Sequence, residues 1–98
     1  MIITKEDILQ KLKALKPELR RRYRVKEIGL FGSYVRGVQR EDSDIDVLVE
    51  FEDKADLFDL VGLAMFLEEK LQRKVDVVPK SALRKEIRDT VLKEVTSL

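Results

Sequence analysis

Asp44 and Asp46 stand two residues apart in a segment that alternates between polar and apolar positions. In a β-strand, alternate side chains project from the same face, so the two carboxylates are predicted to point the same way. Paired carboxylate oxygens suit a hard divalent cation such as Mg²⁺. The alternative is a pair of ordinary solvent-facing aspartates where a strand begins, and the pair alone does not decide between the two.

Gly32 and Ser33 follow the preceding predicted strand, and Ser33 stands eleven residues before Asp44. A glycine at the end of a strand lets the backbone approach a ligand closely, and nearby amides and a hydroxyl can donate to a phosphate. Arg36, on the same turn, could reach a triphosphate or balance the acidic residues. Taken singly, a simple turn and a surface arginine are the simpler interpretations.

Asp76 lies between Val75 and Val77 in a short apolar segment that predicts another strand. A carboxylate in a buried strand is costly unless it is paired or bound to a metal. If this strand neighbours the one that carries Asp46, the three aspartates converge, and they would repel one another unless cations neutralise them. An edge strand with one wet face is the alternative.

The composition narrows the possible chemistry. The 98 residues include no cysteine and no histidine, which excludes thiolate and imidazole ligands and leaves oxygen ligands for Mg²⁺ or Mn²⁺. The 20 Lys and Arg residues nearly cancel the 19 Asp and Glu residues, which argues against binding nucleic acid through bulk charge. No stretch approaches the length of a membrane span, so we expect a cytoplasmic protein that is one domain over residues 1–98.

Helical and strand periodicities predict which elements must position these residues. A first helix opens at Thr4 with Asp7 in a capping box and breaks at Pro17. The remaining elements are a strand over 25–32, a short helical turn and loop over 33–41, a strand over 44–51, the longest helix over 56–71, a strand over 75–78, and a last helix capped by Ser81. This order predicts an α/β (α+β) fold in which helices flank a small mixed sheet of about three strands.

The helix over 56–71 is apolar on more than one stripe, from Leu57 and Phe58 to Phe66 and Leu67. One small sheet does not bury such a surface completely. We expect most of these side chains in the core and the remainder in a patch suited to docking a partner protein.

Three segments together resemble the nucleotidyltransferase superfamily that includes DNA polymerase β: Gly32-Ser33-Tyr34-Val35-Arg36-Gly37, Ser43-Asp44-Ile45-Asp46 and Val75-Asp76-Val77. The stretch from Gly29 to Asp46 is similar to the minimal nucleotidyltransferase (MNT) family, and the resemblance extends over nearly the whole chain. One departure is mild, because Val35 stands where the family commonly has alanine.

The resemblance implies a polymerase β-like fold and a division of roles. Asp44 and Asp46 would hold two Mg²⁺ ions that bridge the triphosphate. Asp76 would complete the metal shell and help to deprotonate the acceptor hydroxyl. Gly32 and Ser33 would hold the β and γ phosphates, with Arg36 beside them.

The resemblance also implies a partner, because small members of the family are often encoded beside a HEPN-domain protein, which is a ribonuclease toxin. The implied activity is transfer of AMP from ATP to a toxin hydroxyl, that of a tyrosine by likeness to the family, as in a type VII-like antitoxin. One alternative is an antitoxin that acts by complex formation alone. Another is a nucleotidyltransferase for a small molecule, although 98 residues leave no second domain for an acceptor pocket.

Overall fold

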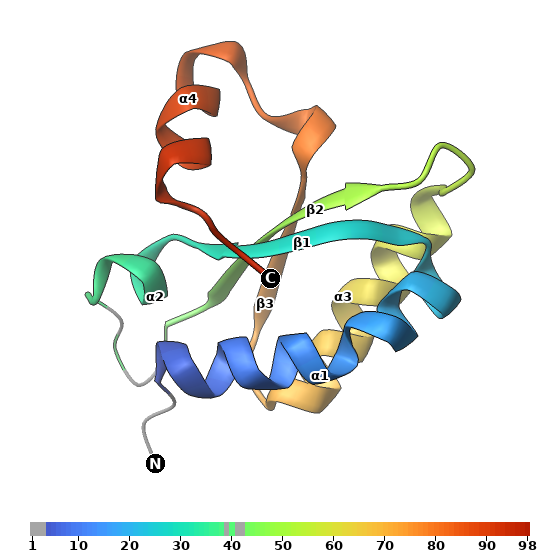
Figure 1. Cartoon of the computed structure of the whole chain (residues 1–98), viewed down its shortest axis with the longest axis horizontal. Helices are drawn as coiled ribbons and strands as arrows, with labels where there is room; N and C mark the ends of the chain where they lie inside the picture. The colour runs from blue at the N-terminus through green and yellow to red at the C-terminus, as the bar shows by residue number, and fades with distance from the viewer. Residues whose placement is uncertain (1–3, 39, 41–42) are drawn as a thin grey trace.

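The computed structural model describes residues 4–38, 40 and 43–98, so the loop predicted up to residue 41 falls partly outside the described residues. Within them the elements follow in the order α1 (Lys5–Tyr23), β1 (Val25–Phe31), α2 (Ser33–Arg36), β2 (Ile45–Phe51), α3 (Leu57–Leu71), β3 (Val75–Pro79), the 3₁₀ helix η1 (Lys80–Ala82), α4 (Lys85–Glu94) and β4 (Thr96–Ser97). Helices flank the sheet, as the sequence predicts (Figure 1).

The sheet is mixed and has the strand order β3-β2-β1-β4. β1 pairs antiparallel with both β2 and β4, whereas β2 and β3 are parallel and are joined through α3. A parallel pair needs a crossover of this kind, because a tight turn cannot connect two strands that run the same way. The three longer strands match the predicted ones, and the two-residue β4 is an addition at the edge.

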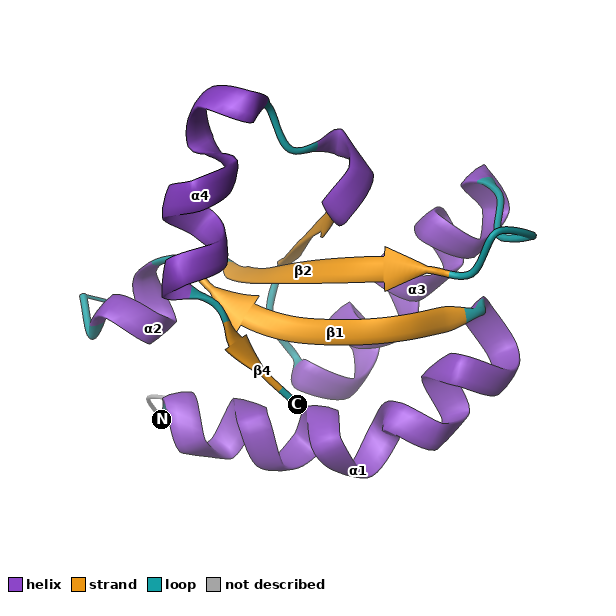
Figure 2. Cartoon of the chain, turned by 45° about the horizontal axis from the view of Figure 1, so that its top comes forward, coloured by secondary structure: helices purple, strands orange, loops and turns teal. Residues whose placement is uncertain are grey.

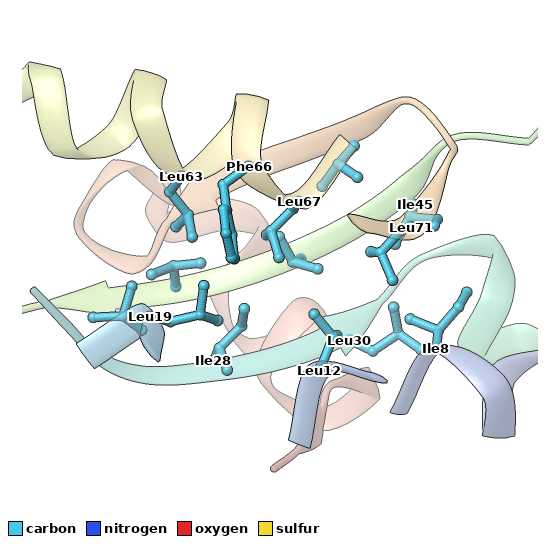
Figure 3. Packing of buried hydrophobic residues seen from close by; sticks show 14 of the residues in the cluster. Ile8, Leu12, Leu19, Ile28, Leu30, Ile45, Leu63, Phe66, Leu67 and Leu71 are labelled. Carbon is cyan, nitrogen blue, oxygen red and sulfur yellow. The ribbon is translucent and has the colours of Figure 1, made fainter. Parts of the chain in front are cut away.

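One face of the sheet carries the core. Ile45, Val47 and Val49 of β2 are fully buried, and their neighbours in register on β1, Ile28 and Leu30, are buried with them. Helices α1 and α3 cover this face, and Figure 3 shows their apolar side chains meeting those of the strands. Side chains alternate between the two faces of a strand. The residues of β2 and β3 that lie between the core-facing ones therefore face the other side of the sheet, which we call the outer face.

Two expectations about the helices differ from the structure. Helix α1 runs through Pro17 without a break, and it is the longest helix, with 19 residues against 15 in α3. Pro17 removes one backbone donor, but Leu12 and Leu19 on either side of it are fully buried in the same core. Packing on both sides of the proline thus holds the helix together. The predicted capping box of Thr4 and Asp7 is present.

The C-terminal region also differs from the prediction. Ser81 does not cap the last helix, because it lies in η1, and α4 begins only at Lys85 after the buried Leu83. Periodicity did not predict β4, whose pairing with β1 depends on a distant strand. Figure 2 shows α4 on the opposite side of the sheet from α1, above the outer face.

The predicted surplus of apolar surface on α3 is confirmed, but the expectation that most of these side chains lie in the core is wrong, because between Leu57 and Leu67 only Leu63, Phe66 and Leu67 are buried. The exposed fractions are 70% for Leu57, 87% for Phe58, 50% for Val61 and 66% for Met65. Leu63 and Leu67, on the other side of the helix, are fully buried. Within the described part of the chain, no helix combines the length and apolar character needed to cross a membrane.

Candidate active site

Asp46 and Asp76 lie side by side on the outer face of the sheet. They are direct partners in the parallel register of β2 and β3. Each is set there by alternation, because the buried Ile45 and Val75 beside them face the core. The strand that carries Asp76 does lie beside the strand that carries Asp46, as the convergence of the two aspartates requires. Asp44 is exposed and stands just before β2 begins, not within it.

The surroundings of Asp46 disfavour the charge of its carboxylate. Partial burial raises the pKa of Asp46 above its ordinary value, and the negative charges of Asp76 and then Asp44 raise this pKa further. The positive charge of Arg36 acts in the opposite direction, and Glu94 adds a weaker upward push. A cation or another positively charged group at this place would relieve the repulsion.

Gly32 lies against Asp46 where β1 ends. Its predecessor, Phe31, is the register partner of Asp46. Gly32 has φ 81° and ψ −150°, a conformation that is essentially restricted to glycine. A β-carbon there would lie 2.2 Å from Oδ2 of Asp46. Both the backbone conformation and the space left by Asp46 thus require glycine at this position.

Ser33 and Arg36 are the first and last residues of the short helix α2, which directly follows Gly32. Tyr34 between them is buried, and its hydroxyl donates to the carbonyl oxygen of Ser43 at 3.5 Å. This contact ties the turn to the segment that carries Asp44. Sequence reasoning did not identify Tyr34 as part of the site, because a buried aromatic residue is an ordinary core residue until its hydroxyl contact is known.

Glu94, in the last turn of α4, also reaches the site and was not predicted. Its Oε2 accepts a hydrogen bond from the Gly32 backbone N–H at 3.3 Å, and its Oε1 lies 3.4 Å from Nε of Arg36. No local pattern could have placed it there, since Glu94 follows Gly32 by more than sixty residues. Two of the predicted phosphate-binding residues, Gly32 and Arg36, therefore share one carboxylate partner.

The carboxylates of the site fit Mg²⁺ as a pair of ligands that substrate phosphates complete, and not as a full protein cage. Among residues 4–38, 40 and 43–98, no three acidic residues form a ready-made metal cluster. Mg²⁺ rarely uses an all-protein cage, and it commonly binds through one or two carboxylates together with substrate phosphates. The adjacent Asp46 and Asp76 provide such a pair on an accessible face, and Asp44 is close enough to influence the charge of Asp46.

Comparison with known proteins supports a nucleotide-transfer chemistry. The family described as "Nucleotidyltransferase domain" matches residues 12–98. The chain is 50% identical over 94 residues to "Protein adenylyltransferase MntA" of Thermococcus cleftensis, which covers 96% of this chain and 95% of that protein.

Two solved structures extend the similarity to three dimensions. A structure of a minimal nucleotidyltransferase superimposes with a TM-score of 0.84 at 35% identity and covers 98% of this chain and 97% of that one. The second is the tri-AMPylated HEPN toxin of Shewanella oneidensis in complex with its MNT antitoxin. It matches with a TM-score of 0.63 at 27% identity, covering 91% of this chain and 68% of that chain.

Proposed function

Because the chain belongs to the nucleotidyltransferase domain family, we propose that it transfers AMP from ATP to a hydroxyl group of a partner HEPN toxin, with tyrosine as the acceptor residue. The observation that carries the proposal is the pairing of Asp46 and Asp76 directly beside Gly32. A metal-bound triphosphate requires carboxylates that hold the metal and, beside them, a backbone segment that the phosphates can approach closely.

We assign the groups of the site to the parts of the nucleotide. Asp46 and Asp76, with Asp44, would hold Mg²⁺, two ions in the family arrangement. When bound, Mg²⁺ neutralises charge on the attacking and leaving oxygens of a phosphoryl transfer. The Gly32 amide, the Ser33 turn and the Arg36 guanidinium would bind the β and γ phosphates.

The proposed reaction needs only the groups of this chain and two substrates, ATP and the partner's hydroxyl group. The acceptor oxygen forms a bond to the α-phosphorus of ATP, the bond from that phosphorus to the β-phosphate oxygen breaks, and pyrophosphate leaves. The hydroxyl proton passes to Asp76, which is exposed at the outer face and can release it to water.

The open outer face favours an acceptor carried by another protein. Asp76 is exposed on this face, so a hydroxyl on the surface of another protein can reach it. The AMP-modified HEPN toxin bound by an MNT antitoxin supports a toxin as the acceptor. Complex formation without chemistry is a second candidate, which the exposed apolar face of α3 favours.

Intact mass spectrometry of the partner tests the proposal. The HEPN protein is incubated with this chain, ATP and Mg²⁺, and its mass is expected to rise by one or more adenylyl groups. Asp46→Asn should abolish the rise. Asp53→Asn, the same change in the exposed turn that follows β2, is the matched control and should leave the rise intact.

The outcome separates enzyme from binding antitoxin. Peptide mapping then locates the AMP, and modification of a residue other than tyrosine would overturn the acceptor assignment alone. A toxin that is neutralised without any gain in mass, equally by the wild type and by Asp46→Asn, would instead establish the binding antitoxin.

A further inference from the structure

The last turn of α4 places a carboxylate in contact with two of the groups that we assign to the phosphates. The Gly32 N–H and the Arg36 guanidinium each contact Glu94, through different oxygens of the same carboxylate. We propose that Glu94 is an internal competitor for the triphosphate: its carboxylate occupies a phosphate position, and nucleotide must displace it to bind. This inference rests on the proposed function and adds a closed state of the same site.

The chemistry of the contact supports this substitution. A carboxylate and a phosphate are both anionic oxygen acceptors, and both pair with backbone N–H groups and with guanidinium. The side chain of Glu94 is 21% exposed, whereas that of Arg36 is 60% exposed. Glu94 is thus the more buried partner of this ion pair, and its carboxylate faces the Gly32 backbone.

Helix α4 is built so that it can move without disturbing the core. All its described residues are exposed or half-buried. The chain is extended on both sides of the helix, at Arg84 and at Val95. Local opening is cheapest for elements with little buried apolar surface. Displacement of Glu94 would therefore leave the packing of α1 and α3 on the sheet intact.

The segment after α4 limits how far the helix can travel. Thr96 pairs with Leu30 of β1, and the carbonyl oxygen of Leu98 accepts a hydrogen bond from Nζ of Lys16. Val95 lies so close to Gly29 that a β-carbon on that glycine would stand 2.6 Å from Cγ2 of Val95. Because Glu94 directly precedes this tied segment, its carboxylate leaves Gly32 by rotation of the side chain, while the C-terminal end of α4 stays attached to the sheet.

Nucleotide affinity measures the competition directly. Binding of the non-hydrolysable ATP analogue AMP-PNP with Mg²⁺ is measured by calorimetry for the wild type, Glu94→Gln and Glu94→Ala. Since a closed state lowers apparent affinity by the fraction of open molecules, both variants are expected to bind more tightly, with Glu94→Ala about fivefold tighter. Glu86→Ala, on the exposed first turn of α4, removes a negative charge from the same helix and should leave affinity unchanged.

A second measurement needs no nucleotide. In the ¹⁵N-labelled protein the Gly32 amide resonance should shift in Glu94→Gln and in Glu94→Ala and not in Glu86→Ala, because only Glu94 accepts the Gly32 N–H. The isosteric Gln variant retains the shape of the side chain, so the comparison stands if the Ala variant does not fold.

Each result decides between the possibilities. Equal nucleotide affinity in the wild type and both Glu94 variants would overturn the competition and leave the nucleotidyltransferase intact. Weaker binding by the variants would make Glu94 a supporting group of the nucleotide site, which also overturns the proposal. If folded wild type and variants all fail to bind AMP-PNP, the proposed nucleotide site is wrong, and the competition is wrong with it.

Discussion

A β-carbon at Gly32 tests the geometry of the site most sharply. In Gly32→Ala the new carbon meets Oδ2 of Asp46 at 2.2 Å, in a backbone conformation with φ 81° and ψ −150°. The conformation costs about 1–3 kcal/mol for a residue with a β-carbon. Pushing the Asp46 carboxylate off its preferred rotamer costs about 0.5–1.5 kcal/mol more.

Gly37→Ala is the matched control. Gly37 also has a positive φ, 75°, at the end of α2, but nothing lies within 4 Å of its added β-carbon. This left-handed conformation alone costs about 1–2 kcal/mol. Gly32→Ala should therefore lower the free energy of unfolding by about 1–2 kcal/mol more than Gly37→Ala, the excess coming from the rarer backbone conformation and the overlap with Asp46.

Chemical denaturation of the two variants measures the difference, and in a domain of this size it corresponds to a melting temperature about 5–15 °C lower for Gly32→Ala. In a double-mutant cycle, Asp46→Ala should recover part of the loss, since it removes the atom that the new β-carbon meets first. Equal destabilisation by the two glycine substitutions, without coupling to Asp46, would refute the close approach of Gly32 to Asp46.

Three further predictions follow from the same site and from α3. Asp46→Asn should stabilise the metal-free protein at neutral pH, measured by chemical denaturation. Because folding raises the pKa of Asp46 above its ordinary 3.8, the charged form is penalised above that pH, and the gain should vanish below it, where the carboxyl is protonated in both states. An unchanged gain in acid would show another cause. Asp44→Asn/Asp46→Asn should lose the Mg²⁺-dependent part of AMP-PNP binding in calorimetry, and equal binding by wild type would remove the metal role. Phe58→Ser/Met65→Ser should leave the melting temperature unchanged, because both side chains are largely exposed, and should weaken capture of the HEPN partner in a binding assay; full affinity would exclude this face of α3 as its docking surface.

Local patterns in the sequence were sufficient to predict which strands carry Asp46 and Asp76 and which way these side chains face. Alternation along residues 44–51 and 75–78 predicted that Asp46 and Asp76 face away from the core, and the structure has both on the outer face. The capping box at Thr4 is likewise local, since Thr4 and Asp7 supply both of its hydrogen bonds within one turn.

Contacts between distant segments decided the rest. Pro17 predicts a break by its own chemistry, yet α1 continues because the side chains around that position are buried against strands that follow later in the chain. β4 is only two residues long and exists through its pairing with β1, which no periodicity can indicate.

The same distinction applies within the site. Residue type, spacing and position at strand ends and turns identify four residues of the site from the sequence, namely Asp46, Asp76, Gly32 and Arg36. Glu94 is one of three acidic residues on α4, and only the return of the chain across the outer face brings its carboxylate to Gly32. The sequence by itself determined which strands carry the carboxylates, because alternation is a property of neighbouring residues. Only the tertiary structure decided what faces them, because that depends on how the last helix folds back over the sheet.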